Sequence, residues 1–389
     1  MTKVCNKGTL PSTALSRALN VVGRASGKID PSYEMVQLEV KNGKLTGRCF
    51  NGTMGILASI PVEDQGSGFD AIVNAQAFAS LAGSMNGPIT LTPEGRKGLK
   101  VECGSVSVTL KSTTKALPEF NDPQVKQILK LSGHDLLELL RVGNSAATDP
   151  MLVFSSVLLD ISSSETSSWA TDSFRAATCV KPVGGEPTSF LLPLAFVSWM
   201  RTIPAKAIVT ISESPNRIVV TAVDDNITLS MTTPKGERQK FPALSSIFNA
   251  VFNTNGILFS VEAAAMNQAA RQVKALGGDT IALYTDGNNL CLRAQTDTAG
   301  YNNTIGTING EIKIFLSSGF VADGMALFET PELLFTDTRS PLAVREGNLR
   351  VLFMPKNMDD KVSTAEDAEK PVSMDAEPVA VEQVEAVAV

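Results

Sequence analysis

The sequence predicts an α+β protein built from three similar domains, and three observations carry this prediction. Segments with the same order of elements begin with strand pairs at Val36, Val157 and Ile281, which are 121 and 124 residues apart. Apolar residues at helical spacing open each unit, and strictly alternating apolar and polar residues close it. Because an alternating strand buries only one face, we expect antiparallel sheets with helices packed on one side.

Each unit is expected to open with one helix and to contain a second helix further on. Helical spacing marks the opening helices at Leu15, Ala18, Leu19 and Val22; Leu136, Leu137, Leu140 and Val142; Ala265, Ala269 and Val273. The second helices each follow a strand and centre on Phe78, Phe196 and Phe320. The alternating residues of the closing strands are Val106, Val108 and Leu110; Ile227, Leu229 and Met231; Leu349, Val351 and Phe353. All of these landmarks repeat with a period near 120 residues, which indicates three homologous domains.

Turns and linkers fit the same scheme. Asn42-Gly43 and Gly287-Asn288 lie between alternating runs, as does the Glu-Gly-Asn segment at residues 346–348, and such pairs favour tight hairpins. Residues 117–120 (LPEF) and 241–244 (FPAL) occupy equivalent unit ends, 124 residues apart, which predicts that they are linkers.

The expected domains are residues 1–122, 123–248 and 249–358, followed by an acidic, disordered tail at residues 359–389. From Met358 onward, nine acidic residues against two lysines give a net charge of −7, whereas the whole chain of 389 residues carries −6. The body therefore has a charge near +1, and the acidity of the chain does not exclude a nucleic-acid partner.

Composition excludes several classes of protein. No apolar run approaches the roughly 18 residues of a membrane span, and the N-terminus lacks a continuous apolar signal core. The five cysteines are scattered, so they predict neither a disulfide framework nor a CxxC metal site. A soluble protein of a reducing compartment is expected.

The chain is interpreted as a non-enzyme without a metal or cofactor. Its single histidine, His134, precedes a helical run and is expected to be solvated, and no Ser/His/Asp or Cys/His arrangement can be assembled without it. The glycine-rich stretch GSGFDA at residues 66–71 precedes a strand instead of following one, which indicates a plain loop and not a dinucleotide site. The adjacent Asp224 and Asp225 are better explained by a turn than by paired-carboxylate catalysis.

Several segments together resemble the bacterial DNA polymerase III β sliding-clamp family. ATDSFR at residues 170–175 looks like the Ala-Thr-Asp-Gly-His-Arg stretch of that family's middle domain. PLAVR at 341–345 with LRVLFMPKNM at 349–358 is similar to its closing strand, and Phe241-Pro242 matches the Phe-Pro that closes its second domain. The resemblance covers about residues 10–358.

The resemblance implies a DNA-clamp fold in a head-to-tail homodimer, closed into a ring with helices lining the hole and sheets forming the outer wall. The expected partners are double-stranded DNA bound without sequence preference, a second copy of the chain, a replicative DNA polymerase and an ATP-dependent clamp loader. Such a ring would act as a processivity factor, because it tethers a polymerase topologically. The expected location is the cytoplasm of a bacterium or of an infected host cell.

Two sets of residues are candidates for contacts with these partners. The expected DNA-facing residues on the lining helices are Arg17, Arg24, Arg141, Arg201, Arg271 and Lys274. The same helices carry the acids Asp135, Glu138, Glu262 and Asp323, so their surplus of about +2 per chain suits sliding better than tight binding. Ordinary solvated arginines are the alternative.

The resemblance also implies a partner-peptide pocket between domains 2 and 3. Its expected residues are Phe154 on the first strand, Thr171, Ser173, Phe174, Arg175 and Ala176 in the Thr-Asp stretch, Pro242 and Ile247 at the linker, and Leu352, Met354 and Pro355 at the end. Such a groove suits a short apolar peptide. Simple packing of the domain interface is the alternative, above all for Ile247 and Leu352.

The pocket departs from the family pattern. Ser173 and Phe174 replace Gly-His, Ala176 replaces a larger aliphatic residue, and KNM at 356–358 replaces Met-Arg-Leu. An altered peptide preference is therefore expected. A clamp-like scaffold that does not encircle DNA is the second hypothesis, and an enzyme of unknown chemistry is a distant third.

Overall fold

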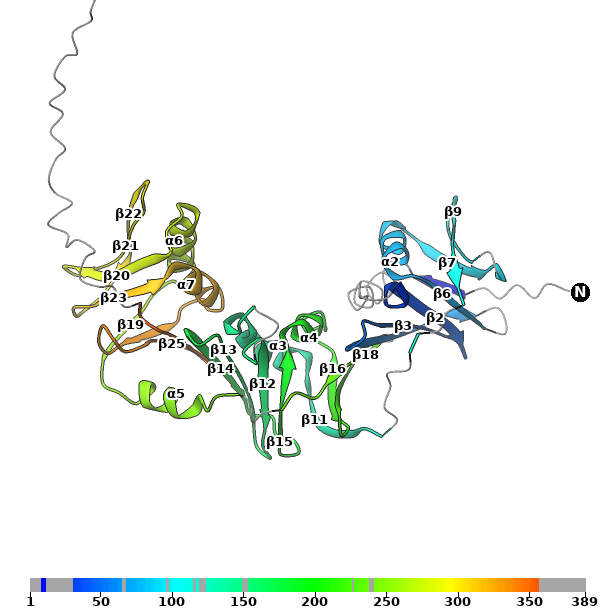
Figure 1. Cartoon of the computed structure of the whole chain (residues 1–389), viewed down its shortest axis with the longest axis horizontal. Coiled ribbons are helices and arrows are strands. Elements are labelled where there is room, and N and C mark those ends of the chain that lie inside the picture. The colour runs from blue at the N-terminus through cyan, green and yellow to red at the C-terminus, as the bar shows by residue number, and fades with distance from the viewer. Residues whose placement is uncertain are drawn as a thin grey trace, which may run out of the picture.

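The computed structural model describes residues 8–11, 31–64, 68–95, 98–114, 117–118, 124–148, 153–225, 227–237 and 241–356. Three lobes follow one another along a crescent (Figure 1). Each lobe has helices on its concave side, whereas the helix Ser245–Phe252, which connects the second and third lobes, lies on the convex side. The predicted opening helix around Leu15 and the acidic tail lie outside the described residues.

The first lobe contains two sheets and one described α-helix. Its helices are η1 (Pro31–Glu34) and α2 (Ala75–Ser84). Its strands are β1 (Gly8–Pro11), β2 (Met35–Lys41), β3 (Lys44–Phe50), β4 (Gly55–Pro61), β5 (Glu63–Asp64), β6 (Phe69–Asn74), β7 (Pro88–Pro93), β8 (Leu99–Cys103), β9 (Val106–Leu110) and β10 (Ser112–Thr113). The hairpin between β2 and β3 turns at Asn42 and Gly43, whose φ angles of 52° and 69° confirm the predicted tight turn.

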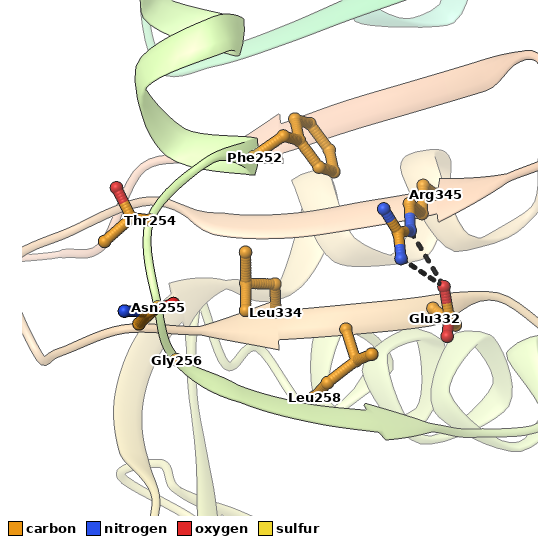
Figure 2. Close-up of a pocket in the computed structure, with 8 residues that line it drawn as sticks. All are labelled: Phe252, Thr254, Asn255, Gly256, Leu258, Glu332, Leu334 and Arg345. Carbon is orange, nitrogen blue, oxygen red and sulfur yellow. Dashed lines mark hydrogen bonds and ion pairs between the residues drawn. The ribbon is translucent and has the colours of Figure 1, made fainter.

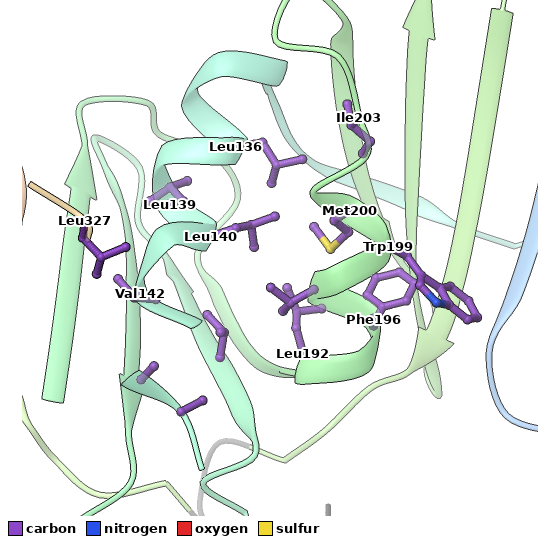
Figure 3. Close-up of a cluster of buried hydrophobic side chains, with 14 of the residues drawn as sticks. Leu136, Leu139, Leu140, Val142, Leu192, Phe196, Trp199, Met200, Ile203 and Leu327 are labelled. Atoms are coloured by element: carbon purple, nitrogen blue, oxygen red, sulfur yellow. The ribbon is translucent and has the colours of Figure 1, made fainter. Parts of the chain in front are cut away.

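The second lobe repeats this order with its opening helix in place. Its helices are α3 (Gly133–Leu140), η3 (Arg141–Ser145) and α4 (Leu194–Met200). Its strands are β11 (Lys126–Ser132), β12 (Ser156–Ile161), β13 (Thr166–Thr171), β14 (Arg175–Lys181), β15 (Thr188–Pro193), β16 (Ile208–Glu213), β17 (Arg217–Asp224) and β18 (Ile227–Pro234). Leu136, Leu140 and Phe196 meet inside the lobe, where α3 packs beside α4 (Figure 3).

The third lobe follows a linker that contains a helix of its own, α5 (Ser245–Phe252). Its other helices are α6 (Ala263–Ala275) and α7 (Ser318–Met325). Its strands are β19 (Ile257–Ser260), β20 (Thr280–Asp286), β21 (Asn289–Gln295), β22 (Gly300–Thr307), β23 (Lys313–Ser317), β24 (Glu332–Phe335), β25 (Leu342–Glu346) and β26 (Leu349–Phe353). The predicted helices at Ala265 and Phe320 are confirmed, whereas α5 was not predicted.

Two of the four sheets run from one lobe into the next. The nine-stranded sheet has the order β10-β6-β2-β3-β4-β18-β17-β16-β11, and the eight-stranded sheet has the order β15-β12-β13-β14-β26-β25-β24-β19. The antiparallel pairs β4–β18 and β14–β26 are the joints. The remaining sheets, β5-β1-β7-β8-β9 and β22-β21-β20-β23, lie at the two ends of the crescent. Backbone hydrogen bonds therefore join neighbouring lobes in series.

A capping network begins α3. The Ser132 hydroxyl accepts a hydrogen bond from the Asp135 amide (3.0 Å) and donates one to Asp135 Oδ2 (2.7 Å). Lys181 Nζ lies 3.3 Å from Asp135 Oδ1. These hydrogen bonds, the Ser132 bond first, lower the pKa of Asp135, and its carboxylate also faces the positive end of the helix dipole.

We expect Asp135→Asn to lower the free energy of unfolding by about 0.5–1 kcal/mol near pH 7. Because the folded-state pKa of Asp135 is lowered, its stabilisation is complete above the unfolded-state pKa and is lost as pH falls through the folded-state pKa. Urea unfolding from pH 7 to pH 3 should show the two proteins converging in acid. A difference that is independent of pH would contradict this account.

Candidate functional site

Four of the six predicted DNA-facing residues lie within the described ranges, on or beside helices that run along the concave side of the crescent. Arg271 and Lys274 lie on α6, and both side chains are exposed. Arg17 and Arg24 lie outside the described residues. Asp135 and Glu262 stand at the starts of α3 and α6, as expected for acids near the positive ends of helix dipoles.

The side chains of Arg141 and Arg201 donate hydrogen bonds to backbone carbonyls of the same chain. Arg141 Nη1 lies 3.1 Å from Glu138 Oε1, and its Nη2 donates to the Leu327 carbonyl in the third lobe. Arg201 Nη2 donates to the Leu140 carbonyl at the end of α3 (2.7 Å). The last carbonyls of a helix lack intrahelical donors, so the Arg201 guanidinium satisfies an acceptor at the end of α3 that would otherwise need another partner. In this structure Arg141 thus links two lobes.

The loop between β13 and β14 positions the centre of the predicted pocket. Asp172 Oδ1 accepts hydrogen bonds from the amides of Phe174 (3.0 Å) and Arg175 (2.9 Å). Between them, Ser173 has a φ of 78°, in the left-handed region that costs a residue with a side chain more than glycine. This turn points Phe174 outward, and its side chain is 61% exposed.

The β13–β14 loop contacts Phe320 and Asp323 of the third lobe, two residues that were not predicted as site residues. Arg175 Nε donates to Asp172 Oδ2 (2.8 Å), and its Nη1 reaches Asp323 Oδ2 on α7 (3.3 Å). The Arg175 guanidinium also lies 4.6 Å from the centre of the Phe320 ring, which stacks on Phe174 at 6.1 Å. Phe320 was recognised only as a repeat landmark, and its equivalents Phe78 and Phe196 are fully buried.

The remaining pocket residues divide into exposed and buried groups. Met354 is 43% exposed, and its amide donates to the Phe174 carbonyl (2.9 Å), so the strand end lies beside the loop. Ile247 on α5 is 48% exposed, and Pro242 is also exposed. Pro355 is half-buried. Thr171 is buried, and its hydroxyl donates to the Arg175 carbonyl.

Ala176 and Leu352 pack the joint between the lobes. They are cross-strand partners in β14 and β26 and belong to a buried cluster with Phe241, Leu244 and Phe248 of the linker. For these two positions the structure shows interface packing. Phe154 was placed on the first strand, but that was wrong: it lies in the turn before β12, where its carbonyl accepts a hydrogen bond from Ala147.

A separate groove of about 230 Å³ lies at the far end of α5 (Figure 2). Phe252, Leu258 and Leu334 provide its apolar surface, and the Glu332–Arg345 ion pair (2.8 Å) lies at one end. None of the predicted pocket residues lines it. Leu258 is 51% exposed, and the groove, which is lined by both polar and apolar residues, is distinct from the Phe174 loop.

His134 and Cys179 both lie within the described residues. His134 is exposed near the start of α3, as predicted, and its Nδ1 lies 3.9 Å from Asp135 Oδ1. Burial raises the pKa of Cys179 to about 11, which disfavours its thiolate. Within these residues there is no group of three His, Cys, Asp or Glu side chains that could hold a metal ion.

Across the described ranges, no helix combines the length and the apolar composition that a membrane crossing requires.

Comparison with known proteins identifies the fold. No protein-family profile and no curated protein sequence matches the chain. The DNA polymerase III β subunit of Thermotoga maritima superposes with a TM-score of 0.79 at 17% identity, over 91% of this chain and 100% of that one. A Pseudomonas aeruginosa sliding clamp bound to griselimycin gives 0.76 at 18%, over 91% and 100%. The Helicobacter pylori β clamp bound to a DNA ligase peptide gives 0.74 at 14%, over 90% and 99%. The chain thus has the sliding-clamp fold of three repeated domains.

Proposed function

We propose that this protein is a DNA sliding clamp, a non-catalytic processivity factor that encircles duplex DNA and tethers a replicative polymerase. The crescent of three repeated lobes, with helices along its concave side, is the observation that carries the proposal (Figure 1). Its domains would be residues 1–122, 123–248 and 249–358, and the second boundary falls within α5. A protein that acts on DNA in this way would work in the cytoplasm of a bacterium or an infected host cell.

A head-to-tail homodimer would close the crescent through the strand pairing that already joins its lobes. In both joints, the closing strand of one lobe (β18 or β26) pairs with the fourth strand of the lobe before it (β4 or β14). The equivalent strands at the two ends are β9 and β22, and each is an edge strand. Pairing β9 with β22 of a second copy, twice, would make a ring without open edges at those positions.

The apolar residues of β9 support this closure. Leu349 and Val351, in the closing strand of the third lobe, are 3% and 0% exposed. Their equivalent in the first lobe, Val106, is 49% exposed, and Val108 is half-buried. A strand with the same alternation but no neighbour on its outer edge is suited to receive one.

Sliding requires weak attraction within the hole. Arg271 and Lys274 are exposed on α6, and a dimer would present each of them twice. Contacts of this kind with phosphates are independent of sequence and weaken with salt. The tethered partner would bind at the Phe174–Met354 surface, and an ATP-dependent loader would open the ring.

Retention on circular DNA tests the proposal. With a clamp loader and ATP, the protein should remain on nicked circular duplex DNA through gel filtration and dissociate when the circle is linearised. Arg271→Glu with Lys274→Glu should lower loading and processive synthesis about tenfold or more, because like charges would face the phosphates. Replacing the exposed Lys44 and Lys130, which lie on strands β3 and β11, by glutamate is the matched control. Equal retention on linear and circular DNA would refute encirclement.

The second hypothesis, a clamp-like scaffold that does not encircle DNA, rests on the commitment of Arg141 and Arg201 to protein carbonyls. It predicts that the α6 charge reversal leaves every activity of the protein unchanged. The same experiment therefore separates the two hypotheses.

A further inference from the structure

The first strand of each lobe can be compared across the repeat, and in two lobes an extended segment of the chain covers its outer side. In the first lobe, β5 pairs antiparallel with β1, so that Gly8 lies opposite Asp64. In the second lobe, the Glu186 amide donates to the Ile128 carbonyl of β11 (2.8 Å). Both covering segments follow the fourth strand of their lobe, β4 or β14. A covering segment at this edge is therefore a feature of the repeat.

In the third lobe, the equivalent segment bonds elsewhere and leaves β19 open. Residues 308–312 follow the fourth strand, β22. The Ile308 amide donates to the Asn288 carbonyl (3.0 Å), and the Ile312 carbonyl accepts the Thr285 amide (3.1 Å), which ties the segment to the β20–β21 hairpin. Among the described residues, the backbone of β19 bonds only to β24. Because every second residue of an edge strand points its backbone groups outward, β19 offers donors and acceptors to another chain.

The side chains on this edge also differ between the second and third lobes. Residues 130–132 (KLS) at the end of β11 and residues 258–260 (LFS) at the end of β19 are both exposed, buried and exposed in turn. Lys130 lies opposite Thr210 in the sheet, whereas Leu258 lies opposite Leu334. A lysine on an edge strand discourages pairing with another chain. Leu258, at the same position and 51% exposed, does not.

The groove beside β19 has room for an apolar side chain and is linked to the predicted peptide pocket. Phe252, Leu258 and Leu334 line it (Figure 2). Helix α5 runs from the pocket residue Ile247 near its start to Phe252 at the groove. Val251 lies one turn beyond Ile247 on the same side of α5 and is half-buried. Apolar side chains therefore follow α5 from the predicted pocket to the open strand.

We propose that β19 and this groove form a second docking site for the tethered polymerase. The segment that flanks the polymerase's apolar peptide adds a strand to β19 and places one apolar side chain in the groove. The occupant is an extended chain, as at the equivalent strands of the other two lobes. Leu352 of the predicted pocket lies three strands from Leu258, about 14 Å at the usual strand spacing, which about five extended residues span. The inference rests on the proposed function, because it assigns a second contact to the same partner.

Peptides of two lengths test this second site. One is the polymerase peptide with its apolar anchor alone, and the other adds about ten native residues on each side, which is enough to reach β19 from either end. By fluorescence anisotropy, the longer peptide should bind the unaltered protein about tenfold more tightly than the shorter one. Leu258→Asp should abolish this gain. Ile208→Asp is the matched control and should retain it, because Ile208 is 55% exposed but lies on β16, which has neighbours on both sides.

The two peptides separate a failure of this inference from a failure of the proposed function. Equal affinity of the two peptides would overturn the second docking site and leave the Phe174–Met354 surface in place. An equal gain in Leu258→Asp would do the same. If neither peptide binds the unaltered protein, the proposed partner is wrong, and this inference falls with it.

Hydrogen exchange shows which chain covers β19. The β19 amides that are not bonded to β24 should exchange about tenfold more slowly with the longer peptide than with the shorter one. Tighter binding without this protection would contradict the addition of a strand. If the same amides are already protected in the free protein and lose protection in a chain that ends at Lys356, the chain's own tail occupies the edge and the proposal is wrong.

Discussion

The V106D variant should behave in solution as a single chain of 41.2 kDa, whereas the unaltered protein should have twice that mass. Val106 lies on the open edge strand β9 and is 49% exposed, so the monomer should fold normally. In the proposed joint its equivalents are apolar, and burying an unpaired carboxylate there is costly. We expect the dissociation constant of the dimer to rise at least about 100-fold.

Val223→Asp is the control for this prediction. Val223 is 43% exposed but lies on β17, which has neighbours on both sides in the nine-stranded sheet. Sedimentation equilibrium should therefore show a dimer for V223D and a monomer for V106D, and only V106D should lose retention on circular DNA. If V106D remained a dimer, pairing of β9 with β22 would not be the contact that joins the two copies.

The second large effect is expected at the partner surface. Phe174→Asp should weaken binding of an apolar peptide from the polymerase at least about 30-fold, in line with the loss of an aromatic anchor. Phe174 is 61% exposed, so its replacement removes contact area without opening the core. Met354 lies beside Phe174, because its amide donates a hydrogen bond to the Phe174 carbonyl. Met354→Asp should therefore weaken binding of the peptide as well.

Leu258→Asp distinguishes this surface from the groove at the far end of α5. Leu258 is 51% exposed and lines that groove (Figure 2). Fluorescence anisotropy with a labelled peptide should show near-normal affinity for L258D and a large loss for F174D, with both proteins dimeric. If L258D lost peptide binding and F174D did not, the peptide would bind in the groove and not at the Phe174–Met354 surface.

Several structural features followed directly from the sequence. Helical spacing located α3 and α6, and the phenylalanine landmarks located α2, α4 and α7. By contrast, α5 was interpreted as part of a linker. A helix of eight residues is marginal by itself and depends on tertiary packing, here the burial of Phe248 against the joint between lobes.

The candidate site was predictable only in part. The resemblance brought Phe174 and Met354 together, and the structure places them side by side. Phe320 and Asp323 were missed because their contact with Arg175 joins positions almost 150 residues apart, and no local pattern marks such a contact. Arg141 was interpreted as DNA-facing, yet its guanidinium binds the Leu327 carbonyl, an acceptor that belongs to the backbone and leaves no mark in the sequence.

The sequence by itself determined the threefold repeat, the type of most elements and which strand faces are buried, because these depend on local spacing of apolar residues. Only the tertiary structure decided that β4 pairs with β18 and β14 with β26, which joins the lobes in series and leaves β9 and β22 at the ends. Those joints are made of backbone hydrogen bonds between distant segments. Every residue except proline offers the same backbone donor and acceptor, so the choice of partner strand is made by the assembled fold.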